Sequence, residues 1–146
     1  MTRTTRTIEA TPDQVWAVLA DGWLYPLWVV GATRMRAVDD AWPAPGSKLH
    51  HSVGVWPLVL NDDTEVVDSV PGHRLDLRAK GWPMGEASVT ITLEPEAVHT
   101  RVVIVEDAVE GPGVLVPGPV RGPMIAWRNV ESLRRLAFLA EGRAAR

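Results

Sequence analysis

The chain has 146 residues, of which 46% are apolar, and a formal net charge of −3. This length fits one domain, which buries roughly 70% of the surface that its unfolded chain exposes, and the apolar content excludes a disordered chain. Cysteine is absent, so disulfides, thiolate catalysis and zinc–thiolate sites are excluded as well.

The charge distribution and the first residues of the chain bear on its surroundings. No apolar run approaches the ~18 residues that a membrane-spanning helix needs, and residues 1–8 lack the apolar core of a signal peptide. The arginines are scattered and form no basic stripe, whereas nucleic-acid binding needs clustered cations. We therefore expect a cytoplasmic protein with no membrane span and no nucleic-acid partner.

The first thirty residues predict one strand and two short helices. Residues 4–10 have the pattern of a strand. Thr11 and Gln14 form a capping box around Pro12, which predicts a helix that ends near residues 21–22. Residues 23–30 predict a second short helix or turn, which Pro26 interrupts and Gly31 closes.

The middle of the chain predicts strands. In residues 86–94 apolar and polar side chains alternate, which is typical of a half-buried antiparallel strand. Proline and glycine separate this segment from others of similar pattern. The six strands predicted here are residues 33–38, 48–55, 58–70, 74–80, 86–94 and 100–107.

The last part of the chain predicts a loop followed by the longest helix. Residues 111–123 contain four glycines and four prolines, so we expect irregular backbone there. Residues 124–141 carry an apolar stripe at helical spacing, and Gly142 provides an end. By its position before this helix, the segment 110–123 is interpreted as a gate to the space beneath.

This order of elements predicts an α+β fold over residues 1–146 as a single domain. A mostly antiparallel sheet whose only long helix comes last must bury its apolar face under that helix. A curved sheet wrapped on a helix tends to leave space between the two layers. The main question is then what fills that space.

Residues along nearly the whole chain carry a resemblance to a known family. They are Thr11-Pro12, residues 23–31, residues 42–51, residues 71–75, Thr100-Arg-Val102 and Trp127-Arg-Asn129. The chain resembles the SRPBCC superfamily of START-like, birch-pollen-allergen-like helix-grip proteins, and most of all its polyketide cyclase/dehydrase and lipid transport branch. The resemblance implies a curved seven-stranded sheet of order 1-7-6-5-4-3-2 and a cavity that binds a lipid, sterol or polyketide.

Strand alternation predicts which polar groups face the interior. Leu49, His51 and Val53 share one face of their strand. In the last strand Arg101 should point to water, which turns Thr100, Val102, Ile104 and Glu106 inward, although Val103 and Val105 leave this register open.

His51 and Glu106 are the candidate catalytic residues. A general base and a general acid in an apolar cavity can move protons on a polyketide or lactone-type ligand. The alternative is that each side chain orients a ligand, pairs with an arginine or satisfies another polar group.

The aromatic residues supply further candidates, because tryptophan accounts for seven of the nine. Trp28 lies between the second helix and the expected mouth, Trp56 and Trp82 precede prolines in turns, and Trp127 begins the last helix. Met35, Met84 and Met124 are candidates for adaptable walls. The full predicted ligand-binding set is Trp28, His51, Val53, Trp56, Glu65, Trp82, Val102, Ile104, Glu106 and Trp127.

Metal and cofactor sites are not indicated. His50 and His51 are adjacent in a strand and point to opposite faces, so they do not chelate one ion easily. The acidic segment 62–65 lacks the glycine and the spacing of a calcium loop. No phosphate loop, dinucleotide fingerprint or nucleophile elbow occurs. We expect no cofactor and no metal.

Three functions are consistent with these features. The first is binding of a hydrophobic small molecule between the sheet and the last helix. The second is a polyketide aromatase/cyclase-type reaction that uses His51 or Glu106. The third is a protein-interaction module like the co-chaperone relatives of the superfamily. A monomer or a homodimer is expected in each case.

Overall fold

The computed structural model describes residues 1–53, 60–80 and 85–145. The bounds of its elements are β1 Thr2–Ile8, α1 Pro12–Leu19, η1 Gly22–Leu24, α2 Tyr25–Trp28, β2 Ala32–Val38, β3 Lys48–Val53, β4 Leu60–Val70, β5 Arg74–Lys80, β6 Glu86–Glu96, β7 His99–Glu110, η2 Pro112–Leu115 and α3 Gly118–Ala144. Among the helices of these residues, none is both long enough and apolar enough to span a membrane.

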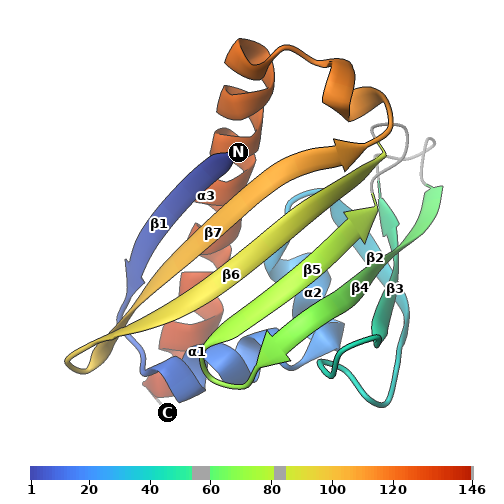
Figure 1. Cartoon of the computed structure of the whole chain (residues 1–146). Helices are drawn as coiled ribbons and strands as arrows, with labels where there is room; N and C mark the ends of the chain where they lie inside the picture. The colour runs from blue at the N-terminus through green and yellow to red at the C-terminus, as the bar shows by residue number, and fades with distance from the viewer. Residues whose placement is uncertain (54–59, 81–84, 146) are drawn as a thin grey trace.

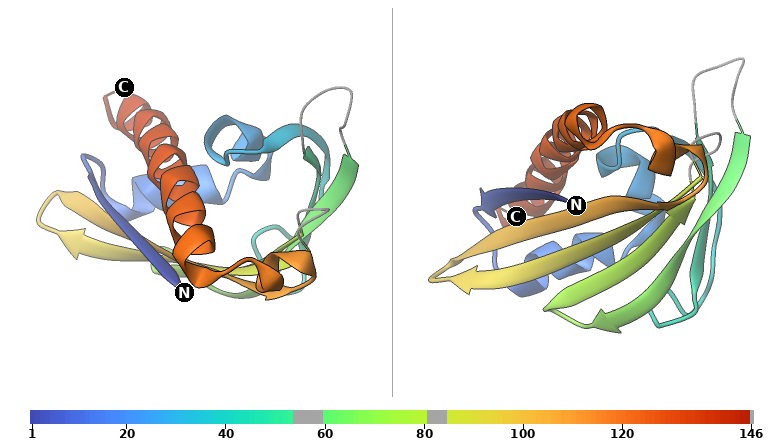
Figure 2. Two further views of the ribbon diagram at one scale, coloured as in Figure 1. Left: turned by 90° about the horizontal axis from the view of Figure 1, so that it is seen from above. Right: turned by 45° about the horizontal axis from the view of Figure 1, so that its top comes forward.

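The seven strands form one antiparallel sheet in the order β1-β7-β6-β5-β4-β3-β2. The sheet curves, and α3 runs along its concave side together with α1 and α2 (Figures 1 and 2). The α+β class predicted from the order of elements is confirmed, and so are the helix-grip sheet and the strand order that the family resemblance implies.

The first helix forms as its capping box predicts. The Thr11 amide donates to Gln14 Oε1 at 2.8 Å, and the Gln14 amide donates to Thr11 Oγ1 at 3.3 Å. These two bonds satisfy backbone donors that a helix start leaves without partners. Val15, Val18 and Leu19 then face the core.

The long helix covers the sheet in two different ways along its length. Its buried side chains all lie at or after residue 129: Asn129, Ser132, Leu133, Leu136, Ala137 and Ala140. In the first eleven described residues of α3, by contrast, every side chain is exposed or only partly buried. The C-terminal half of α3 thus completes the core, while its N-terminal half lies over a part of the sheet that it does not fill.

The inward side chains of the sheet become smaller toward that unfilled end. Three cross-strand rows follow one another on β5, β6 and β7: Leu75–Ile91–Ile104, then Leu77–Val89–Glu106, then Ala79–Ala87–Ala108. The last row consists of methyl groups only, so the concave surface recedes there. This shortening of side chains hollows the sheet beneath the start of α3.

The segment 111–123 is more regular than predicted. A 3-10 turn occupies Pro112–Leu115, and α3 begins at Gly118 instead of residue 124. Pro119 lies in the first turn, where a missing N–H costs nothing, and only Pro123 removes a backbone bond inside the helix. The sequence composition overstates the irregularity because it ignores where in a helix each proline falls.

Gly22 marks a close approach between η1 and the sheet. A Cβ atom at this position would lie 2.4 Å from Leu49 Cδ2 and 2.9 Å from Val38 Cγ1. We expect Gly22→Ala to destabilise the fold by about 1–3 kcal/mol through overpacking. Gly142→Ala is the matched control: a Cβ there meets nothing within 4 Å, and alanine in the helix should stabilise by roughly 0.5–1 kcal/mol. Chemical unfolding of both variants measures this; equal effects would contradict the packing.

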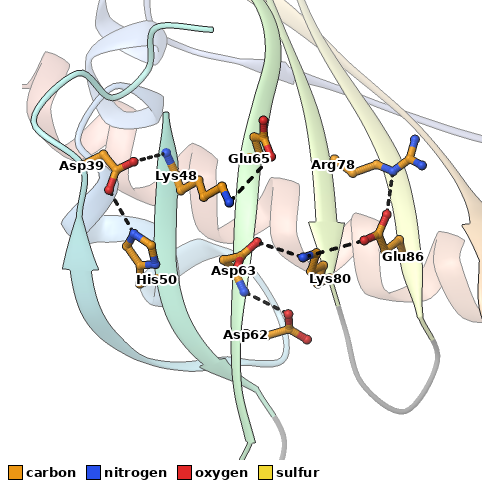
Figure 3. Close-up of polar contacts among 9 residues, drawn as sticks. All are labelled: Asp39, Lys48, His50, Asp62, Asp63, Glu65, Arg78, Lys80 and Glu86. Carbon is orange, nitrogen blue, oxygen red and sulfur yellow. Dashed lines mark hydrogen bonds and ion pairs between the residues drawn. The ribbon is translucent and has the colours of Figure 1, made fainter. Parts of the chain in front are cut away.

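The convex face of the sheet carries a series of ion pairs (Figure 3). Nζ of Lys48 lies 4.0 Å from Oε2 of Glu65. Nζ of Lys80 lies 3.7 Å from Oδ1 of Asp63 and 3.9 Å from Oε1 of Glu86. Such exposed pairs contribute little to stability individually. These pairs engage the charged groups at the end of β5 and the start of β6, next to the alanine row.

Candidate ligand-binding cavity

A cavity of about 780 Å³ lies between the N-terminal half of α3 and the ends of β5, β6 and β7. Its volume falls within the range of small-molecule sites, roughly 300–1,000 Å³. The residues that line it are Val30, Gly31, Ala79, Lys80, Gly85, Glu86, Ala87, Glu106, Ala108, Gly113, Val116, Arg121, Pro123, Met124, Ile125, Trp127 and Arg128. Most of these side chains are apolar.

The alanine row and the helix form opposite walls of the cavity. Ala79, Ala87 and Ala108 are all half-buried, which is consistent with methyl groups facing a void instead of a packed neighbour. Met124 and Arg128 come from positions one helical turn apart and so project from the same side of α3. The cavity therefore exists because a row of small side chains lies opposite the part of the helix that carries no buried residue.

An ion pair crosses the cavity between its two walls. Glu106 on β7 is only 4% exposed, and its carboxylate Oε2 accepts a hydrogen bond from Nη2 of Arg128 on α3. The Arg128 side chain keeps 40% of its surface exposed. Desolvation lowers the pKa of Arg128 from its ordinary value, yet the guanidinium stays charged at neutral pH. The pair places a strong polar group on an otherwise apolar wall.

Arg121 fixes the segment that leads into α3. Its Nη1 donates to the carbonyl oxygens of Val114 at 3.0 Å and Val116 at 3.2 Å, and its Nη2 lies 3.3 Å from Asp107 Oδ1. These contacts satisfy carbonyls of the glycine- and proline-rich segment. One side chain thus ties the rim of the cavity to the end of β7.

The rim also exposes large apolar side chains. Trp127 lines the cavity and is 72% exposed, and Met124 beside it is exposed as well. Leaving an indole this accessible forgoes the stabilisation that its burial would provide. A ligand in the cavity would cover part of this surface.

A second polar cluster lies on β3 and β4. His51 Nε2 is 2.8 Å from Thr64 Oγ1, which is in turn 3.2 Å from the Tyr25 hydroxyl. The Tyr25 and His51 rings stack with centroids 5.4 Å apart. Nδ1 of His51 is enclosed and has no hydrogen-bond partner among the described residues. The charge of Arg128 opposes the rise in the Tyr25 pKa that burial causes, so the two clusters interact electrostatically.

Burial lowers the pKa of His51, although the nearby carboxylates of Asp62 and Asp63 oppose this shift. The folded protein therefore holds a neutral imidazole that the unfolded chain protonates below pH ~6.5. Because the unfolded state binds more protons there, stability should fall as the pH drops below this value. We expect His51→Gln, which cannot titrate, to lose less stability than the wild type between pH 7 and pH 5.

Urea unfolding at both pH values measures this difference, with His73→Gln as the control because His73 is exposed. Two results would show that burial of His51 does not couple its protonation to folding. In the first, His51→Gln loses as much unfolding free energy between pH 7 and pH 5 as the wild type does. In the second, His73→Gln reduces that loss as much as His51→Gln does.

The predicted site residues lie in different surroundings. Glu106 and Trp127 line the cavity. Trp28, Val102 and Ile104 are buried in the core instead, where the Trp28 ring meets Tyr25 edge-on. Trp56 and Trp82 lie outside the described residues, as does the side chain of Val53, the last described residue of β3.

Glu65 requires a correction. It belongs to the predicted ligand-binding set, but its neighbours Thr64 and Val66 on β4 are both buried, and strand alternation then points Glu65 away from the cavity. Its side chain is 46% exposed and faces Lys48 on the convex side of the sheet (Figure 3).

The structure does not join His51 and Glu106. They lie on β3 and β7, with three strands between them in the sheet, and they hydrogen-bond to Thr64 and Arg128 respectively. A reaction that used both as acid and base would need a ligand that reaches both clusters. Within the described part of the chain, no group of three His, Asp or Glu side chains is arranged to hold a metal ion.

Sequence reasoning did not find the alanine row, Arg121 or Arg128. Alanine at inward strand positions is typical of a packed core, and arginine in a helix is typical of a solvent-exposed charge. One signal was available: an inward carboxylate at Glu106 demands a cation nearby, and the helix that covers its strand offers Arg128.

Residues 2–141 match the polyketide cyclase/dehydrase and lipid transport family. The chain belongs to this family. No curated protein matches the sequence.

Several solved structures share the fold of this member of the polyketide cyclase/dehydrase and lipid transport family. Protein NE0264 from Nitrosomonas europaea is 17% identical with a TM-score of 0.74, and the match covers 99% of this chain and 96% of that one. Ara h 8.0201 is 13% identical with a TM-score of 0.70, covering 98% and 95%. The di-domain ARO/CYC StfQ from the steffimycin biosynthetic pathway is 12% identical with a TM-score of 0.74, covering 99% of this chain and 51% of StfQ. At these identities the likeness establishes the fold alone.

Proposed function

We propose that this protein binds a hydrophobic small molecule in the cavity between the sheet and the start of α3. The observation that carries the proposal is the 780 Å³ space lined by the alanine row and by apolar side chains of α3. Apolar surface removed from water contributes roughly 25 cal/mol per Å² before the ordering costs of binding, so such a space favours an apolar guest.

The family supports this proposal in general terms, because its description names lipid transport beside polyketide cyclases and dehydrases. The exposed Trp127 at the rim supports it independently. An indole that lines a cavity and remains accessible to water offers a large apolar contact at the place where a ligand enters or rests.

Native mass spectrometry of freshly purified protein tests the proposal. We expect a fraction of the protein to carry a bound small molecule whose mass disappears after denaturation and refolding. The refolded protein should then bind Nile red, a neutral apolar dye, with an increase in fluorescence. Protein that carries no molecule as purified and also leaves the dye fluorescence unchanged would contradict the proposal.

A further inference from the structure

Five charged residues contribute to the lining of the cavity, and each is already paired within the protein, Lys80 and Glu86 on the convex side of the sheet. They are Lys80, Glu86, Glu106, Arg121 and Arg128. Arg121 pairs with Asp107 and Arg128 with Glu106, while Lys80 lies within 3.9 Å of Glu86. No charge on the lining of the described residues is therefore left for a ligand to neutralise.

The Glu106–Arg128 pair nevertheless retains hydrogen-bonding capacity. A guanidinium has five N–H donors and a carboxylate has two acceptor oxygens, and the contact between them joins Nη2 to Oε2. Among the described residues, Oε1 of Glu106 and the Nε and Nη1 groups of Arg128 have no other partner. The pair thus presents an acceptor and several donors side by side on an apolar wall.

We infer that the ligand is electrically neutral and carries a hydroxyl group of the phenol, enol or alcohol type that binds to this pair. This inference rests on the proposed function and specifies its ligand class. A hydroxyl donates to Glu106 Oε1 and accepts from Arg128 in the same position, so it matches both halves of the pair. A carboxylate matches only Arg128, and it brings an unbalanced negative charge next to Glu106 into a site of low polarity.

Three probes that share one ring system test the inference: naphthalene, 2-naphthol and 2-naphthoate, each measured by displacement of Nile red. One hydrogen bond to a charged group corresponds to a gain of about tenfold or more. We expect 2-naphthol to bind about tenfold more tightly than naphthalene and at least tenfold more tightly than 2-naphthoate.

A change of charge in the pair should reverse the preference. In Glu106→Gln the Arg128 cation loses its partner, so we expect 2-naphthoate to become the tightest of the three probes. Glu96→Gln is the matched control, because it makes the same change of net charge at an exposed position and should leave the wild-type order intact.

The possible results separate the two proposals. If none of the probes nor Nile red binds, the proposed function and this inference both fail. If naphthalene binds as tightly as 2-naphthol, or if 2-naphthoate binds the wild type most tightly, the inference fails while the proposed function stands. The ranking on the wild-type protein decides the matter even if Glu106→Gln does not fold.

Discussion

Replacing Ala87 by tryptophan is expected to lower the affinity for neutral apolar probes by about tenfold or more. Ala87 lies on β6 at the centre of the alanine row, between Ala79 and Ala108, so a larger side chain there extends across the cavity toward α3. Displacing about 60 Å² of apolar ligand contact corresponds to roughly 1.5 kcal/mol, or about tenfold in the dissociation constant.

The same substitution should not reduce stability. The new indole enters space that no protein atom occupies, so the overpacking cost of a filled core does not arise. Ser88→Trp is the matched control, because the adjacent residue places the same side chain on the convex face of the same strand. Nile red titration and urea unfolding of both variants measure the two effects. Equal loss of binding in both variants, or unimpaired binding in Ala87→Trp, would contradict the assigned position of the ligand.

The second large effect is an asymmetry between the two members of the ion pair. Removing one partner of a buried pair is costly because the other charge remains desolvated. Arg128→Met leaves Glu106, which is 4% exposed, without its cation and should cost about 3 kcal/mol. Glu106→Gln leaves Arg128, which keeps 40% of its side chain exposed, and should cost only about 1 kcal/mol.

A double-mutant cycle measured by chemical unfolding tests this asymmetry. The variant with both substitutions should lose less stability than the sum of the single losses, because neither charge is then left alone. A larger cost for Glu106→Gln than for Arg128→Met would mean that Arg128, and not Glu106, is the desolvated member of the pair.

The fold was largely predictable because its determinants are local and periodic. The capping box at Thr11 and Gln14 forms as expected, and the alternation in residues 86–94 appears in β6. In β7 the burial of Val102, Ile104 and Glu106 agrees with the register expected from an outward Arg101, although Val103 on the other face is buried as well. The strand order of the sheet came from the family resemblance and not from these patterns.

The cavity itself was much less predictable. A cavity arises where side chains are too short to fill the space. Alanine at positions 79, 87 and 108 has the same alternating pattern in the sequence as the residues of a packed core. Its polar pair joins β7 to α3 across 22 residues of sequence, so no local motif contains both members. Trp28 illustrates the converse: its large side chain suggested a cavity wall, but it packs against Tyr25 in the core.

The position of a bound ligand distinguishes a site inside the curved sheet from a site on the surface. Nuclear Overhauser effects between naphthalene and the methyl groups of the protein report this position at atomic detail. We predict contacts to the methyl groups of Ala79, Ala87 and Ala108, which line the cavity opposite α3. Contacts confined to exposed side chains elsewhere, such as Leu27 or Val98, would contradict a binding site inside the curved sheet.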